Sequence, residues 1–123
     1  MSLPTNLQYT EEHEWIDDLG EKVRIGITAH AAESLGDIVY VQLPEVGEQI
    51  ESGKTCGELE STKSVSDLFA PVTGEVVAVN EDVDDDPAIV NSEPFGKGWL
   101  IEVRVTETGP VLTAEQYAQL IGQ

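Results

Sequence analysis

Short runs of alternating apolar and polar residues fill most of the chain, which is the pattern of half-buried β-strands. Gly, Pro, Asn, Asp and Ser residues separate the runs and favour turns. The pattern predicts a mainly β fold, with strands at 13–16, 23–27, 38–43, 57–61, 65–69, 75–79 and 99–105.

Two short helical segments are predicted between the strands. Residues 28–36 have Thr28 in a favourable N-cap position and Gly36 as the residue that ends the helix. Residues 84–91 predict a single helical turn with Pro87 at its first position, where the missing N–H costs nothing. Both segments are too short to change the mainly β assignment.

The C-terminal segment 113–122 predicts a longer helix. Thr113 and Gln116 have the spacing of a capping box, in which each side chain bonds to the other residue's backbone N–H. Its apolar residues fall on one helical face. They are Ala114, Tyr117, Ala118 and Ile121. We therefore expect a terminal helix packed on the β core.

An internal sequence repeat predicts how these strands are arranged. The motif Pro-x-x-Gly-Glu at 44–48 recurs 27 positions later at 71–75. Apolar residues recur at the same shift: Ile38 and Val65, Val41 and Leu68, Ile50 and Val77. Proline fixes φ on entry to a turn, and glycine permits a positive φ within it. Two similar strand–turn–strand units predict two stacked antiparallel sheets, a flattened barrel or sandwich, as one domain over 1–123.

The charge narrows the possible partners. Lys and Arg number 6 against 24 Asp and Glu, giving a formal net charge of −18. Such a chain repels nucleic acid and anionic membranes, so we expect neither as a partner. We expect a monomer whose protein partners offer basic docking faces. The start of the chain lacks a signal or transit pattern, and a lone Cys56 excludes an internal disulfide, so a reducing compartment is expected. This is the cytoplasm, or the mitochondrial matrix if the chain is a processed eukaryotic form.

Four features suggest other kinds of site, but the residues around each argue against that site. The tetrapeptide SGKT at 52–55 lacks the upstream glycine of a phosphate-binding loop, because Glu48 stands there. The acidic stretch 82–93 has calcium-loop spacing, but Pro87 replaces the required glycine, so only weak, adventitious cation binding is expected. Cys56 has no neighbouring base and is expected to be a packed thiol. Neither histidine lies in a catalytic motif, and His13 and Glu14 are expected on opposite strand faces.

One lysine has unusual surroundings. The stretch GELESTKSVSDLF, residues 57–69, places Lys63 among Ser and Thr residues between two predicted strands. Hydroxyl side chains bond readily to nearby backbone and so favour a chain reversal. The pattern therefore predicts a hairpin that displays Lys63 in water at its tip. The pattern alone is more typical of an ordinary surface lysine.

Longer motifs show a family resemblance over residues 9–117. They are YTEEHEW, LGDIVYVQLPEVG, LESTKSVSDLFAPVTGEVVAVNE and LTAEQY. Together they resemble the H proteins of the glycine cleavage system, and ESTKSVSD is the most specific of them. The resemblance implies a lipoyl/biotinyl-type flattened barrel with added terminal elements. It also implies a carrier rather than an enzyme, with lipoate in amide linkage to Lys63.

The resemblance further implies a set of partners. Glycine decarboxylase (P protein) loads an aminomethyl group onto the lipoyl arm. Aminomethyltransferase (T protein) takes the one-carbon unit from the arm, and dihydrolipoyl dehydrogenase (L protein) re-oxidises the dithiol. A lipoate ligase or a lipoyl/octanoyl transferase attaches the arm. The strained five-membered disulfide ring opens readily, because an unstrained disulfide prefers a dihedral near ±90°.

Two acidic residues gain roles from this resemblance. Glu14 and Asp67 match the positions that contact the loaded arm, which is sheltered from water in a cleft of the protein. As a separate hypothesis, the acidic residues around Lys63, namely Glu58, Glu60 and Asp67, mark the site for the lipoylating enzyme. This chain departs from its relatives at Glu12, where a small polar residue is frequent. It departs again at Ser34, where some relatives carry a histidine that meets the arm.

Two alternatives remain at the level of sequence. One is a lipoyl domain, or a lipoyl relay, of a 2-oxoacid dehydrogenase complex. Those domains are shorter, usually carry DKA at the tip and end in flexible linkers, whereas this chain ends in a capped helix. The other is an acidic, divalent-metal-binding interaction protein built around residues 81–86. A biotinyl domain is disfavoured because Thr62 and Ser64, not methionines, flank Lys63.

Overall fold

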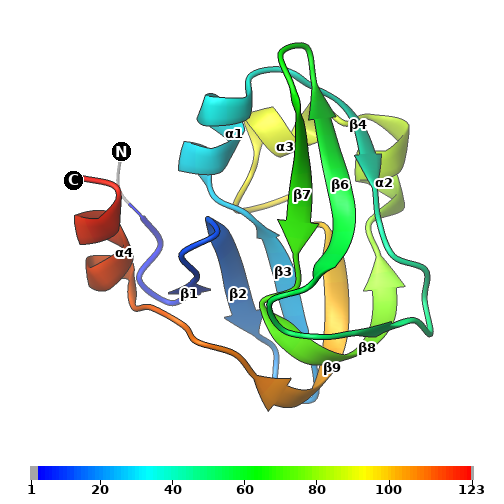
Figure 1. The fold of residues 1–123 in the computed structure, drawn as a ribbon, viewed down its shortest axis with the longest axis vertical. Coiled ribbons are helices and arrows are strands. Elements are labelled where there is room, and N and C mark those ends of the chain that lie inside the picture. The colour runs from blue at the N-terminus through cyan, green and yellow to red at the C-terminus, as the bar shows by residue number, and fades with distance from the viewer. Residues whose placement is uncertain (1–2, 123) are drawn as a thin grey trace.

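The computed structural model describes residues 3–122 as two antiparallel sheets with four short helices at their edges (Figure 1). The larger sheet has the order β1-β2-β3-β9-β8-β5, and the smaller has the order β4-β6-β7. The strands are β1 (Gln8–Tyr9), β2 (Glu14–Asp18), β3 (Val23–Ile27), β4 (Ile38–Gln42), β5 (Gln49–Ile50), β6 (Thr55–Ser61), β7 (Val65–Phe69), β8 (Val72–Val79) and β9 (Ile101–Thr108). The helices are α1 (Ala29–Leu35), α2 (Glu81–Asp85), α3 (Ile89–Ser92) and α4 (Ala114–Leu120).

All seven predicted strands are present, and those at 23–27 and 65–69 have the predicted bounds. The strand predicted from residue 13 begins at Glu14, because His13 has a φ of +67° and cannot continue a strand. Strands β1 and β5 were not predicted. Each is only two residues long, so it has no alternation to detect.

The main core lies between the two sheets, which pack face to face. Ile25 and Val103 from the larger sheet join Val41, Leu59 and Leu68 from the smaller sheet in one buried cluster. Burying the apolar faces of both sheets is the principal source of stability in such a two-layer fold. The smaller sheet leaves its outer face uncovered, with the β6–β7 hairpin projecting at the top of Figure 1.

The repeat corresponds to two equivalent units. In each unit the first strand (β4 or β7) belongs to the smaller sheet and the second (β5 or β8) to the larger sheet. Gly47 has the expected positive φ, at +94°. The same expectation for Gly74 is wrong. Gly74 lies inside β8 at a register shift, and a Cβ there would collide with the backbone oxygen of Arg104.

The helix caps follow the sequence closely. Thr28 Oγ1 accepts a hydrogen bond from Ala31 N at 3.2 Å, and Gly36 ends α1. The position given to Pro87 is wrong, because α3 begins at Ile89 with Ala88 as its N-cap. Pro87 thus lies between two helices: α2, which was not predicted, and α3. No helix among residues 3–122 is long and apolar enough to cross a membrane.

Helix α4 covers a second, aromatic cluster. The predicted capping box is confirmed, with Gln116 N donating to Thr113 Oγ1 at 3.2 Å and Thr113 N donating to Gln116 Oε1 at 2.9 Å. The ring of Tyr117 stacks on that of Tyr9, with 4.9 Å between centroids, beside the buried indole of Trp15. The C-terminal helix is therefore an integral part of the fold.

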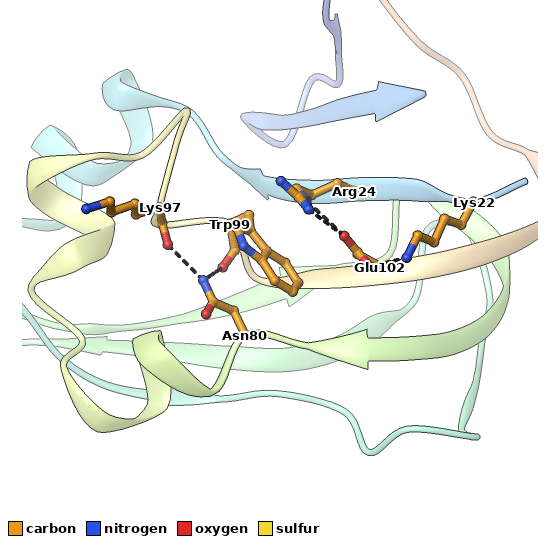
Figure 2. Close-up of polar contacts among 6 residues, drawn as sticks. All are labelled: Lys22, Arg24, Asn80, Lys97, Trp99 and Glu102. Atoms are coloured by element: carbon orange, nitrogen blue, oxygen red, sulfur yellow. Dashed lines mark hydrogen bonds and ion pairs between the residues drawn. The ribbon is translucent and has the colours of Figure 1, made fainter. Parts of the chain in front are cut away.

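A buried carboxylate of the larger sheet binds two basic side chains. Glu102 accepts from Lys22 Nζ at 2.7 Å and from Arg24 Nε at 2.9 Å (Figure 2). Arg24 also lies over the ring of Trp99, at 4.8 Å from its centroid. In the same view Asn80 Nδ2 donates to the backbone oxygens of Lys97 and Trp99. The side chains of Lys22 and Arg24 are thereby engaged in structural contacts.

Candidate functional site

The turn that carries Lys63 is built around one hydroxyl. Ser61 Oγ accepts hydrogen bonds from Lys63 N at 3.1 Å and from Ser64 N at 3.0 Å. Ser61 N and Ser61 Oγ both donate to Ser64 O, at 2.8 and 3.1 Å. The predicted hairpin is confirmed, with β6 and β7 as its strands. A serine at this position satisfies the backbone of a tight reversal without help from water.

The tip is also tied to the loop that follows α1. Thr62 N donates to Asp37 O at 3.0 Å. On either side of Asp37, Asn91 of α3 donates from Nδ2 to Gly36 O at 2.8 Å and accepts from Ile38 N at 2.8 Å. One amide side chain thus clamps the loop on which the hairpin rests. The tip is held by long-range contacts rather than projecting alone.

The side chain of Lys63 is exposed, and its stem lies against Gly36. A Cβ on Gly36 would be 2.9 Å from Lys63 Cε, so a side chain there would push the lysine stem aside. Within residues 3–122, four ion pairs occur and none involves Lys63. The amine is therefore accessible from solvent and not neutralised by a neighbouring carboxylate.

A cleft of about 240 Å³ opens beside the hairpin. It runs between β7 and α1 and is closed below by the start of β2. The lining brings together Glu14 and Asp67, the two predicted arm contacts, with Glu12 and Ser34, the two departures from the family pattern. Apolar residues complete the wall: Ile27, Ala31, Leu35, Leu59, Leu68 and Phe69. The cleft is thus partly apolar, with carboxyl groups at separate points.

Glu14 is the unusual member of this cleft. It is only 2% exposed, and its Oε1 accepts a hydrogen bond from Thr10 Oγ1 at 3.0 Å. Its pKa is raised to about 8, chiefly by burial; the hydrogen bond from Thr10 opposes the rise, the charge of Glu12 adds to it, and a backbone hydrogen bond from Phe69 opposes it. At neutral pH Glu14 is therefore mainly protonated.

Glu14 also borders a second hollow. This hollow has a volume of about 400 Å³. It lies between the segment that joins β1 to β2 and the residues at the C-terminal end of β7 and after β9. Glu12, Glu14 and Phe69 line both cavities. The two hollows thus meet at one buried carboxyl group.

The outer face of the smaller sheet holds the other predicted residues. Glu58 pairs with Asp67 and Glu60 with Val65 across the β6–β7 ladder, and all four are exposed. Directly opposed residues share a face of the sheet. Glu58 and Glu60 do not line the cleft, so the structure separates them from Glu14. Asp67 belongs to both regions, because it lines the cleft and opposes Glu58.

Sequence reasoning missed a polar cluster beside the cleft. The hydroxyl of Tyr117 lies 2.8 Å from His13 Nδ1 and 2.7 Å from Thr28 Oγ1. His13 also faces His30, with 5.0 Å between ring centroids, and burial followed by the charge of His30 lowers the pKa of His13. His13 and Tyr117 are 104 positions apart in the chain, so no local motif signals the contact.

The remaining candidates have structural surroundings. Cys56 is half-buried, and burial followed by nearby Glu14 and Glu48 raises its pKa to about 12, as expected for a packed, unreactive thiol. Residues 81–85 of the acidic stretch form α2 rather than a ligand loop. In the described part of the chain, no three His, Cys, Asp or Glu side chains are placed to hold a metal ion together.

Comparisons with known proteins agree with this geometry. The family model described as "Glycine cleavage H-protein" matches residues 7–123. A glycine cleavage system H protein of Streptomyces avermitilis is 58% identical over 124 residues, 99% of both chains. One of Corynebacterium aurimucosum is 55% identical over 126 residues, 98% of this chain and 97% of the relative.

A solved relative has the same fold. The crystal structure of a glycine cleavage system H protein from Mycobacterium marinum aligns with a TM-score of 0.94 at 50% identity, over 98% of this chain and 100% of that one. The predicted fold class, a lipoyl-type barrel with added helices, is confirmed. Full-length matches of this kind do not favour a shorter lipoyl domain or an acidic metal-binding protein. The chain belongs to the glycine cleavage H-protein family.

Proposed function

We propose that this chain serves glycine cleavage as a carrier whose tether point is Lys63, which bears lipoate in amide linkage. The observation that carries the proposal is an exposed, unpaired amine on a braced hairpin tip, next to a cleft with a buried carboxyl group. Acylation of this amine removes one positive charge and breaks no ion pair among residues 3–122. When bound, lipoate supplies a strained cyclic disulfide that opens to accept an aminomethyl group.

The chain's own contribution is to position the lipoyl arm and to shelter the group that the arm carries. The Ser61 turn and the Asn91 clamp fix the point of attachment. A tether on a rigid scaffold gives several separate enzymes a high effective concentration of the same arm. The chain needs no catalytic residue of its own for this task, so we assign none.

Glu14 gives the cleft a preference for a primary ammonium. A cation entering the cleft favours the ionised form of a nearby carboxyl, so Glu14 releases its proton as the cation arrives. The resulting pair is shielded from water, because Glu14 is buried and Thr10 Oγ1 donates to the carboxylate. Asp67, at the exposed edge of the same cleft, adds a second negative charge.

The partners follow from the family. We expect the chain to meet glycine decarboxylase, aminomethyltransferase and dihydrolipoyl dehydrogenase, together with a lipoate ligase or a lipoyl/octanoyl transferase. We expect these interactions to take place in the cytoplasm, where the single, half-buried Cys56 stays reduced. Glu58 and Glu60, exposed on the strand that leads to Lys63, are proposed as recognition points for the attaching enzyme.

Intact mass and peptide mapping test this assignment. Purified chain is incubated with lipoate, ATP and a lipoate–protein ligase. We expect one lipoyl mass increment, located on the peptide that contains Lys63. The variant Lys63→Arg keeps the charge but loses the acceptor, so it should gain no mass. Lys97→Arg is the matched control and should be modified like the wild type. An increment that persists in Lys63→Arg would refute the proposed tether.

A further inference from the structure

A row of three exposed residues crosses the outer face of the smaller sheet. Tyr40 pairs with Glu60, and Glu60 pairs with Val65, so their side chains share that face. Tyr40 is 50% exposed and Val65 is 59% exposed. An aromatic and an aliphatic side chain therefore flank a carboxylate in water, three residues before the acceptor Lys63.

The row continues into a hollow at the edge of the sheet. Tyr40 also lines a depression of about 390 Å³ beside β4. Val46, which is 61% exposed, lines it as well, with Glu45, Glu81 and Asp84 among the other residues. We define the Tyr40 face as this hollow together with the exposed row and Glu58. It combines large apolar side chains with carboxylates on both sides of Tyr40.

The Tyr40 face has no positive charge of its own. None of its defining residues is Lys or Arg. Within residues 3–122, the basic side chains that form ion pairs do so elsewhere, with Glu51, Glu75 and Glu102. Glu58 and Glu60 therefore keep their charges available. The surface fits a partner that offers basic residues around an apolar pocket.

We propose that the Tyr40 face is the docking surface for the enzyme that acylates Lys63 from a phosphate-bearing acyl donor. The proposal rests on the proposed function, since it requires Lys63 to be the acceptor. Tyr40 acts as the apolar anchor, and Glu58 and Glu60 set the orientation. These residues position the substrate protein and take no part in bond formation.

The chemistry of acylation identifies this partner. In transfer from an acyl-adenylate, the deprotonated Lys63 amine attacks the acyl carbon. The C–N bond forms, the C–O bond to phosphate breaks, and AMP and one proton leave. An enzyme that holds an adenylate needs cationic groups beside its active site. The carboxylates next to Lys63 complement such a site.

The position of the cleft supports the same choice. An enzyme that draws a loaded arm out of the cleft must approach between β7 and α1, where Glu14 and Asp67 lie. The acylating enzyme meets a bare lysine and has no need of the cleft. It can bind the hairpin tip and the outer face of the smaller sheet, because β6 and β7 belong to both (Figure 1).

Steady-state acylation with a lipoate–protein ligase, lipoate and ATP tests the proposal. Because truncation of an aromatic anchor weakens docking, we expect Tyr40→Ser to raise the KM for this protein by about tenfold at unchanged kcat. Tyr40→Phe keeps the ring and should retain the wild-type KM. Glu58→Gln with Glu60→Gln should lower kcat/KM and flatten its decline with salt.

Matched controls lie on other faces. Leu120→Ser on α4 removes an apolar side chain of equal 50% exposure, and Glu107→Gln on β9 removes an exposed charge. Both should behave like the wild type. Urea unfolding midpoints verify that each variant is folded. If Tyr40→Ser keeps the wild-type KM, or impairs only the reaction of pre-lipoylated chain with glycine decarboxylase, the assigned partner is wrong. A wild type that accepts no lipoyl group would overturn the proposed function itself.

Discussion

The stem of Lys63 rests on Gly36, the residue that ends α1. A Cβ at Gly36 would lie 2.9 Å from Lys63 Cε, and the backbone of Gly36 has a φ of +87° with a ψ of −157°. This backbone conformation is essentially restricted to glycine. The end of α1 and the hairpin tip thus lie against each other, and Lys63 stays exposed with no ion pair among residues 3–122.

Replacing Gly36 by alanine should destabilise the protein by about 1–3 kcal/mol, because its backbone conformation strains any residue that has a Cβ. Urea unfolding measures the loss. Gly47→Ala is the control, since Gly47 has a φ of +94° but nothing within 4 Å of its Cβ position. In a Lys63→Ala background, Gly36→Ala should cost nearly as much, because the flexible Lys63 stem can move aside whereas the backbone strain remains. A cost that disappears in the Lys63→Ala background would show that the Lys63 stem, and not the backbone conformation, excludes a side chain at Gly36.

The buried Glu14 predicts a pH dependence of stability. Its pKa is raised from 4.5 to about 8 in the folded chain, so the unfolded chain ionises first as pH increases. The stability tied to protonated Glu14 is present below about pH 4.5 and is lost as pH rises to about 8. Glu14→Gln lacks this loss.

The free energy of unfolding of Glu14→Gln minus that of the wild type should therefore be flat in acid, rise by up to about 1.4 kcal/mol per pH unit, and level off above pH 8. Urea denaturation at a series of pH values gives this difference. Glu107→Gln, at an exposed position, serves as the control and should show no such rise. A difference for Glu14→Gln that does not change with pH would mean that Glu14 is ionised in the folded protein.

The strands and the tip were open to sequence reasoning because their signals are local. Alternation marks β3 and β7, and the Ser61–Ser64 cluster marks the reversal between β6 and β7. Thr113 and Gln116 mark the start of α4 in the same way. Each of these features depends on residues within a few positions of one another.

The environment of Glu14 was not open to such reasoning. Its surroundings include a backbone hydrogen bond from Phe69, which is distant in sequence. The same holds for Asn91, which braces the tip through contacts 53 and 55 positions away. Helix α2 was not predicted for another reason: its run of acidic residues is typical of a loop, and the N-cap bond from Asp82 N to Asn80 Oδ1 is seen only in the structure. The cleft as a whole is a product of tertiary packing.

Loss of the Glu14 carboxyl should shorten the lifetime of the aminomethyl load. The pair between the load's ammonium and Glu14 holds the arm in the cleft, away from water. In chain that has been lipoylated and loaded with glycine and decarboxylase, Glu14→Ala should release its load several-fold faster, as measured by formaldehyde or ammonia production. Glu107→Ala should decay like the wild type. An unchanged rate in Glu14→Ala would show that Glu14 does not protect the aminomethyl load.

The hydroxyl of Tyr117 should stabilise the region behind the cleft. It lies 2.8 Å from His13 Nδ1 and 2.7 Å from Thr28 Oγ1, the N-cap of α1. Tyr117→Phe removes both contacts, which leaves Thr28 Oγ1 with only its bond from Ala31 N, and should cost about 1–3 kcal/mol in urea unfolding. Tyr9→Phe is a suitable comparison, because its hydroxyl bonds only to Pro4 O near the chain start, and a smaller loss is expected. A larger loss in Tyr9→Phe would contradict this role of Tyr117.

The most direct test of Lys63 as the tether is the exchange of bicarbonate carbon into glycine catalysed by the cognate decarboxylase. Three samples are compared: unmodified chain, chain lipoylated by a ligase, and Lys63→Arg treated with the same ligase. We predict that only lipoylated wild-type chain supports rapid exchange. Comparable exchange with the ligase-treated Lys63→Arg chain would contradict the account.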